Sequence, residues 1–145
     1  TAEAVVGISD SRREVIANVI QRGVEADKSV EQIAQDIVDA TSGEIGMARA
    51  RRIARTETHA AAMYGQQAAA EASPLEFQKV WLATEDHRTR KDHADANGQT
   101  VALDEMFQVG DAEMLYPGDM DAPAEQVINC RCVALYEPAA MGEQT

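Results

Sequence analysis

The strongest constraint on the fold is a stretch from residue 44 to residue 72 that contains no proline and is rich in Ala, Arg, Glu, Gln and Met. These residue types favour a helix. The stretch ends at Ser73 and Pro74, and the residue before a proline is disfavoured in α geometry. The sequence therefore predicts one long helix over residues 44–72. Its inner face is expected to hold Ile53, Ala54, Ala61, Tyr64 and Ala68.

Two shorter helices are predicted upstream of the long one. Between Asp10 and about Val24, apolar residues recur at helical spacing, and Gly23 lies near the expected end. Ser29 followed by Gln32 is a capping-box pattern, and an apolar face continues from there. We expect this second helix to end before Gly43.

The residues after Pro74 have the character of a small sheet. Residues 77–84 carry aromatic and branched side chains without a helical period, which predicts a strand. The later expected elements are a short helix over residues 90–96, extended segments over 100–103 and 106–109, and a closing strand over 131–136. The Gly, Pro and Asp residues of 110–123 predict an irregular acidic loop, which is a candidate surface for a basic partner.

These elements predict an α+β fold, in which N-terminal helices including one long helix precede a small mixed or antiparallel β-sheet. A chain of 145 residues suffices for one compact domain. Residues 1–28 are expected to form a lead-in helix of that domain, residues 29–137 its main part and residues 138–145 a flexible tail. Because residue 1 is Thr rather than Met, we expect the chain to be a piece of a longer protein.

The charge balance restricts the partners that the surface as a whole would attract. The net charge is −12, and the acidity lies mainly in the C-terminal part: residues 1–73 hold 8 basic and 11 acidic residues, and residues 74–145 hold 5 and 14. Such a surface repels nucleic acid and anionic lipid unless a local patch reverses its sign. No apolar run approaches the roughly 20 residues that span a bilayer, so no membrane partner is expected.

A local patch of that kind occurs in the long helix, which holds the densest basic cluster of the chain. Arg51, Arg52 and Arg55 lie close together there, next to Arg49 and followed by His59. Arginine binds carboxylate and phosphate in bidentate fashion, so this strip is a candidate partner-binding site. The alternative is that these arginines pair with acidic residues of the same domain.

A second polar constellation follows the first predicted strand, where functional sites often collect. Its members are Trp81, Asp86, His87, Arg88, Thr89, Arg90, His93 and Gly98. One hypothesis is a nuclease-like centre, in which His93 or His87 exchanges protons and Arg88 or Arg90 stabilises phosphate charge. The other is a structural turn in which Asp86 pairs with one of these arginines.

The two cysteines stand in the segment Asn129-Cys130-Arg131-Cys132. Their spacing excludes a disulfide framework and favours a reduced cytoplasmic origin. Two thiolates with His93 or His87 are candidate ligands of a zinc ion, although four dependable ligands are not visible. The alternative is that both cysteines are small buried apolar residues and that the domain carries no cofactor.

Three motifs in this order resemble the phage Mu protein F-like head-morphogenesis family. They are Ala50 to Glu57, then Trp81 with residues 86–90, His93 and Gly98, and finally residues 129–132. The resemblance covers roughly Ser29 to Tyr136. Many relatives have Cys-x-x-Cys where this chain has residues 90–93, and His-Pro where it has Val127 and Ile128.

The resemblance implies a minor capsid protein with a structural rather than an enzymatic role. Its expected location is the virion, assembled in the cytoplasm of a bacterial host. The expected partners are portal or capsid proteins, with packaged DNA as a further partner of the strip at Arg51, Arg52 and Arg55. The second and third motifs would then have a structural role, in which they join the end of the first strand to the start of the last strand. The residues expected to make this connection are Trp81, Asp86, Arg88, Thr89, His93, Gly98, Asn129 and Arg131. Some relatives are fused to toxin or nuclease modules, which keeps the nuclease alternative open.

Overall fold

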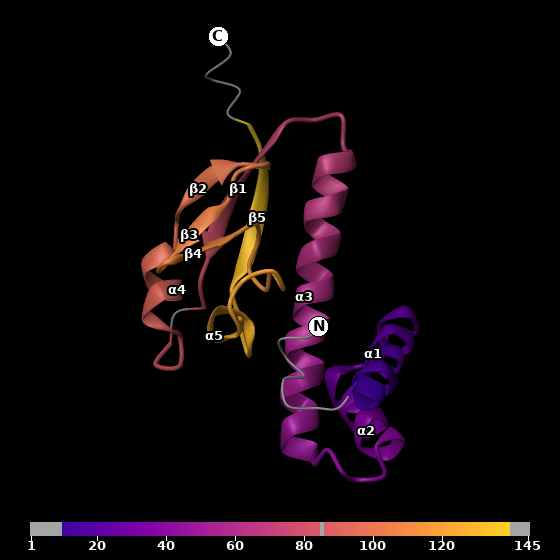
Figure 1. Ribbon diagram of the computed structural model, residues 1–145. Helices are drawn as coiled ribbons and strands as arrows, with labels where there is room; N and C mark the ends of the chain where they lie inside the picture. Colours follow the sequence, from indigo (N-terminus) through magenta and orange to yellow (C-terminus); the bar gives the residue numbers. More distant parts are fainter. Residues whose placement is uncertain (1–9, 85, 140–145) are drawn as a thin grey trace.

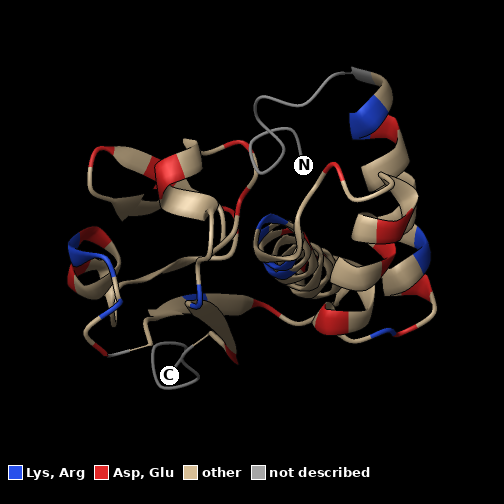
Figure 2. Ribbon diagram, turned by 90° about the horizontal axis from the view of Figure 1, so that it is seen from below, with Lys and Arg blue, Asp and Glu red and all other residues tan. Residues whose placement is uncertain are grey.

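In the computed structural model, which describes residues 10–84 and 86–139, the long helix stands between two different halves. Two short helices pack on one side of it, and strands with two further small helices lie on the other (Figure 1). Looking along the long helix, Figure 2 shows the same arrangement, with the long helix end-on between the two halves. The fold is α+β, as predicted from the sequence.

Three helices form the first half. They are α1 (Asp10–Glu25), α2 (Val30–Ala40) and α3 (Met47–Ala72). The predicted capping box starts α2: the Gln32 N–H donates to Ser29 Oγ at 3.1 Å, and the Ser29 N–H donates to Gln32 Oε1 at 2.9 Å. The three helices enclose an apolar core that includes Ile16, Ile33, Ile37 and Ile53. Of the predicted lead-in helix, residues 1–9 lie outside the described residues.

The inner face of α3 differs from the prediction over its second half. Ile53 and Ala54 are buried as expected, but Ala61, Tyr64 and Ala68 are exposed. The buried positions there are Ala60, Met63, Gln67 and Ala70. The prediction was wrong because it followed apolar residues alone, whereas this face also contains the polar residues Thr56, Glu57 and Gln67.

The second half is built on an antiparallel sheet in the order β2-β1-β5. Its strands are β1 (Phe77–Leu82), β2 (Thr100–Ala102) and β5 (Val133–Pro138), and Trp81 of β1 pairs with Ala134 of β5. A separate hairpin pairs β3 (Phe107–Val109) with β4 (Ala112–Met114). The predicted tail begins too early, because Pro138 pairs with Phe77 and the Ala139 N–H donates to the Glu76 carbonyl at 2.9 Å.

The predicted irregular loop at residues 110–123 is packed structure. It contains β4, and the side chains of Met114 and Ala122 are buried in the second core. Asp119 is 5% exposed, and its carboxylate accepts hydrogen bonds from the Leu115 and Asp121 N–H groups at 2.8 and 3.0 Å. The prediction failed because one acidic residue of this segment, Asp119, is buried and binds backbone N–H groups of the same segment instead of facing solvent.

A second apolar core lies between the sheet, the hairpin and the two small helices α4 (Lys91–Ala96) and α5 (Ala124–Val127). Its members include Trp81, Phe107, Val109, Met114, Val127, Cys130 and Cys132. Trp81 contacts Phe107 edge to face, with ring centroids 5.3 Å apart. Short α5 was not predicted, and it brings Gln126 under α4.

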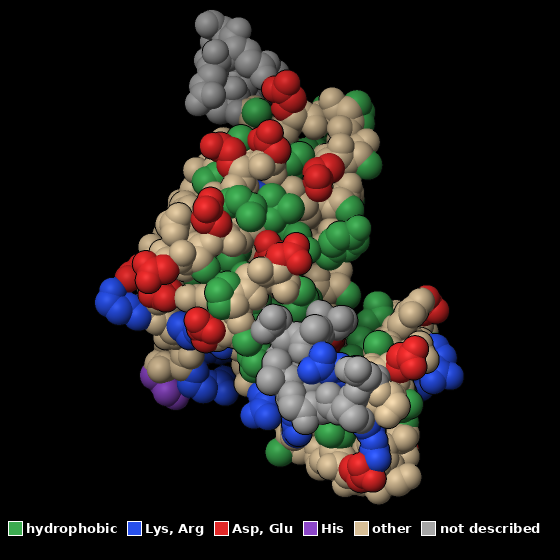
Figure 3. Space-filling model, in the orientation of Figure 1, with side chains coloured by type: hydrophobic (Ala, Val, Ile, Leu, Met, Phe, Trp, Pro, Cys, Tyr) green, Lys and Arg blue, Asp and Glu red, His purple; other side chains and the backbone are tan. Residues whose placement is uncertain are grey.

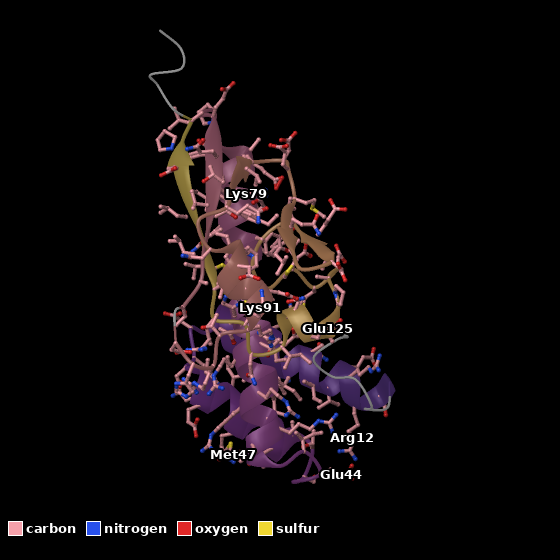
Figure 4. The ribbon with its side chains drawn as sticks, turned by 90° about the vertical axis from the view of Figure 1, so that its left-hand side faces the viewer. Arg12, Glu44, Met47, Lys79, Lys91 and Glu125 are labelled. Atoms are coloured by element: carbon pink, nitrogen blue, oxygen red, sulfur yellow. The ribbon has the colours of Figure 1, made fainter. Side chains whose placement is uncertain are left out.

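Two hydrogen bonds of Gln67 connect α3 to the second half. Its side-chain amide donates to the Leu103 carbonyl at 2.9 Å, and the Tyr136 hydroxyl donates to Gln67 Oε1 at 2.8 Å. At the far end of the first half, Arg12 and Glu44 form an ion pair that can be followed in Figure 4. Within residues 10–84 and 86–139, no helix combines the length and apolar character needed to cross a membrane.

Candidate functional site

The polar constellation predicted from the sequence assembles where β1 ends. The turn after β1, the segment before β5 and the middle of α3 meet there. Arg131 donates two hydrogen bonds of 2.7 Å to the two carboxylate oxygens of Asp86. The Thr84 hydroxyl donates to the Arg131 carbonyl at 2.8 Å. The exit of the first strand is thereby joined to the entry of the last.

Asp86 organises this turn as an ionised carboxylate. Besides Arg131, it accepts the Arg88 N–H at 2.8 Å. The hydrogen bonds from Arg131, and then the one from the Arg88 backbone, hold the pKa of Asp86 well below its usual range. Thr89 closes the turn by donating its hydroxyl to the Thr84 carbonyl. The sequence hypothesis that Asp86 pairs with Arg88 or Arg90 is therefore replaced by a pair with Arg131.

Trp81 and Gly98 support the turn from the core side. Trp81 is fully buried, and its ring lies edge to face against His93, with centroids 5.5 Å apart. The Gly98 N–H donates to the Trp81 carbonyl at 2.7 Å. Gly98 has φ +85°, a conformation that glycine adopts without strain.

His93, Cys130 and Cys132 form a buried cluster beneath the turn. His93 Nδ1 lies 3.3 Å from Cys132 Sγ and 3.7 Å from Cys130 Sγ, and the three side chains are at most 2% exposed. The hydrogen bond from the Cys130 thiol lowers the pKa of Cys132, against the opposing effect of burial. The same hydrogen bond to Cys132, together with burial, raises the pKa of Cys130. His87 is exposed and lies outside this cluster.

A relay of hydrogen bonds fixes the tautomer of His93. Its Nε2 lies 2.9 Å from Gln126 Oε1, and Gln126 Nε2 donates to Asp92 Oδ2 at 2.8 Å. Because the NH₂ group of Gln126 donates to Asp92, its carbonyl oxygen faces His93 and accepts a hydrogen bond there. His93 therefore carries its proton on Nε2, and the lone pair of Nδ1 points at the two sulfurs.

Thr56 and His59 of α3 contact the cysteine segment. The Asn129 N–H donates to Thr56 Oγ1 at 3.0 Å, and His59 Nε2 donates to the Cys132 carbonyl at 2.6 Å. Asn129 has φ +57°, so it contributes through its backbone turn. The sequence analysis grouped His59 with the basic strip, but burial lowers its pKa and the ring is turned inward. The spacing of Thr56 and His59 on one helix face was the available signal.

An arginine-lined pocket opens beside this cluster. Its volume is about 460 Å³, and its walls are Arg55, Arg88, Arg90, Asn129 and Arg131. In the view of Figure 3, most of the visible basic side chains lie over the lower part of the molecule, whereas most of the acidic side chains lie over the upper part. Arg90 donates to the Ile128 carbonyl and Arg131 binds Asp86, which orients both. We call this the arginine pocket.

Of the predicted strip on α3, only Arg55 belongs to the arginine pocket. Arg51 makes a bidentate ion pair with Glu31 of α2, with nitrogen–oxygen distances of 2.7 to 3.1 Å. Arg52 is exposed. The three arginines of the strip therefore differ in their contacts, since Arg51 binds α2 whereas Arg55 lines the arginine pocket together with Arg88 and Arg90.

Three proteins with related sequences match most of this chain. It is 36% identical over 128 residues to Minor head protein GP7 of Bacillus phage SPP1, a match covering 83% of the chain and 39% of that protein. It is 33% identical over 129 residues to NAD(+)–arginine ADP-ribosyltransferase EFV of Enterococcus faecalis, covering 87% and 26%. It is 29% identical over 124 residues to Uncharacterized protein YqbB of Bacillus subtilis, covering 83% and 40%.

The chain thus spans between about a quarter and two fifths of the length of these relatives. No solved structure matches it. The family described as Phage Mu protein F like protein matches residues 13–135, which include α2, α3, β1 to β4, the first half of β5 and the whole site. The chain therefore belongs to the phage Mu protein F-like family.

Proposed function

We propose that this domain is a structural part of a tailed-phage head and that it binds an acidic surface of a portal or capsid protein through the arginine pocket. The family and the relative named a minor head protein support the role in the head. The arginine pocket carries the proposal for the contact. The domain would then be found in the virion after assembly in the bacterial host.

The charge distribution supports a carboxylate-rich partner. The chain has a net charge of −12, yet four guanidinium groups line one concave pocket. Concave walls of one sign concentrate the field, so the pocket attracts anionic side chains although the domain as a whole is acidic. Arg55 and Arg88 are exposed, and among the described residues no carboxylate lies in ion-pair contact with either. They are available for bidentate contacts with a partner.

Packaged DNA fits the domain less well. A long duplex touching the pocket would also approach the acidic remainder of the surface, where phosphates are repelled. A protein partner needs to present only a few carboxylates to the pocket. DNA is accordingly the competing occupant that the experiment must separate.

The test is capture of partners from a lysate in which the phage is assembling, with and without nuclease treatment. The wild-type chain is compared with Arg55→Ala/Arg88→Ala, and Arg22→Ala/Lys28→Ala on the first half serves as a control with the same loss of charge. Portal or capsid protein should bind wild type and control in nuclease-treated lysate and fall by about tenfold or more with the pocket variant, since each lost charged contact costs about 1.5 kcal/mol or more. Equal recovery by both variants, or loss of all recovery on nuclease treatment, would contradict the proposal.

The nuclease alternative has less support from the geometry. His93 is 1% exposed, and its two nitrogens face Gln126 and the cysteine sulfurs. A general base must come within hydrogen-bond reach of the proton it removes, and this ring is turned away from solvent. Cleavage of RNA or DNA by the wild-type chain that is lost in a folded His93→Ala variant would restore that hypothesis.

A further inference from the structure

Three potential metal ligands converge in the second core. The ligand atoms of His93, Cys130 and Cys132 all lie within 4.8 Å of one another, and they come from α4 and from the segment before β5. We propose that one Zn²⁺ ion binds to His93 Nδ1 and to the Sγ atoms of Cys130 and Cys132, with a water molecule as the fourth ligand. This proposal does not rest on the proposed contact with a head protein.

The distances fit a tetrahedral ion. Zinc–sulfur bonds of about 2.3 Å and zinc–nitrogen bonds of about 2.0–2.1 Å, at a tetrahedral angle, put nitrogen and sulfur ligands about 3.6 Å apart. The two observed separations, 3.3 and 3.7 Å, lie on either side of that value. Two thiolates and an imidazole are also the donor set that zinc prefers over hard cations such as Mg²⁺.

The surroundings of His93 match those of a metal-binding imidazole. Such a histidine usually donates its other ring N–H to a fixed acceptor, which sets the tautomer and directs the free lone pair at the metal. Gln126 Oε1 is that acceptor, at 2.9 Å, and Asp92 orients Gln126 in turn. A purely apolar role for the cysteines would not require a histidine held in this tautomer.

The fourth position faces a small cavity. His93 and Cys132 form part of its wall, together with Thr84, Thr89 and Asn129 and with three arginines of the arginine pocket, Arg88, Arg90 and Arg131. The volume is about 10 Å³, close to the minimum that holds one water molecule. Within the described residues no further His, Cys, Asp or Glu joins the three ligands. A water molecule therefore completes the coordination.

The first experiment measures metal in the wild-type chain, purified without chelator and kept reduced with a phosphine. Elemental analysis should give about one zinc ion per chain. Replacement by Co²⁺ should give the visible bands of a tetrahedral ion and a thiolate-to-cobalt charge-transfer band. Metal-free protein that gives no thiolate band with Co²⁺ would overturn the proposal, because the contacts of His93 would then be thiol hydrogen bonds. This measurement requires no variant, so misfolding cannot mask it.

The second experiment tests the ligands and the fourth position. Cys130→Ser and Cys132→Ser should abolish stoichiometric binding, whereas His87→Ala, which removes an exposed histidine outside the cluster, should keep it. Gln126→Leu keeps all three ligands and should weaken binding by about 10- to 100-fold. Unchanged affinity in Gln126→Leu would contradict the role of the relay. X-ray absorption of the zinc-loaded chain should show two sulfur neighbours and two nitrogen or oxygen neighbours at the distances of a tetrahedral ion, and a fit with three neighbours in all would rule out the water ligand.

Discussion

Lys79 is the clearest case of a residue whose properties are set by its surroundings. Its side chain lies on the inner face of β1, fully buried, with Nζ donating to the Leu115 carbonyl at 2.6 Å and lying 5.3 Å from the centre of the Phe107 ring. Figure 4 shows this lysine over the sheet, far from Lys91 on α4. Burial lowers the pKa of Lys79 to about 8.

This pKa predicts a pH dependence of stability that can be assigned to one side chain. In the unfolded chain the lysine pKa is about 10.4, so between about pH 8 and pH 10 the unfolded state binds more protons at this group than the folded state. The contribution of Lys79 to the free energy of unfolding should therefore rise with pH in that window, by about 1–2 kcal/mol, and stay constant below about pH 7. The comparison is wild type against Lys79→Met, by urea unfolding at pH 7, 8, 9 and 10.

Lys91→Met is the matched control. Lys91 is exposed and its pKa is raised by its hydrogen bond to Asp95, so its contribution should not rise over the same pH range. Taking the difference from wild type removes the titration of the cysteines and tyrosines, which all three proteins share. A flat difference between wild type and Lys79→Met would mean that the buried lysine is solvated to an extent that the contacts do not suggest.

At the scale of elements, replacing either of two helical glycines by alanine should change the stability in opposite directions. A Cβ at Gly23 of α1 would lie 2.6 Å from Cγ1 of Ile33, which is fully buried in α2. A Cβ at Gly65 of α3 would meet nothing within 4 Å. Gly23 is thus required for the close approach of α1 and α2, whereas Gly65 only weakens its helix.

Gly65→Ala should therefore stabilise the protein by about 0.5–1 kcal/mol, the usual gain of Ala over Gly in a helix. Gly23→Ala has the same gain in helix propensity but overpacks the core, and it should destabilise by about 1–2 kcal/mol net. Thermal and urea unfolding of the two variants measure the change in the free energy of unfolding, and its sign, for each substitution. If Gly23→Ala proved as stabilising as Gly65→Ala, Ile33 would have to repack without cost.

At the scale of the whole molecule, α3 belongs to both halves, because it contributes Ile53 to the first core and Gln67 to the hydrogen bonds with the second half. We expect wild-type unfolding to be one transition. The single tryptophan, Trp81, reports on the second core by fluorescence, and far-ultraviolet circular dichroism reports mainly on the helices. The two signals should coincide.

Gln67→Leu should separate these signals. It leaves the Leu103 carbonyl and the Tyr136 hydroxyl without their partner, at a cost of about 1–3 kcal/mol for each group that stays buried. The tryptophan transition should then move to lower urea than the helical one. Gln66→Leu, at the neighbouring exposed position, should leave both transitions within about 0.5 kcal/mol of wild type. Coincident transitions in Gln67→Leu would show that the two cores unfold together without this link.

The sequence alone determined the elements that depend on a few neighbouring residues. Pro74 ends the long helix, Ser29 and Gln32 start α2, and the β-favouring residues after Phe77 form the first strand. Helix propensity, capping and proline geometry act within about one turn, so they can be read from a short window. The order of the motifs also sufficed to identify the family.

Only the tertiary structure decided which polar side chains are buried and which distant residues share a site. The side chains of Gln67 and Lys79 can be buried because each donates a hydrogen bond to a carbonyl 36 residues further along the chain. No local sequence pattern indicates these partners. The arginine pocket joins Arg55 to Arg131, and the cysteine cluster depends on a tautomer set by Gln126. Burial of a polar group is stable only when a partner satisfies it, and the packing of the two halves around α3 supplies that partner.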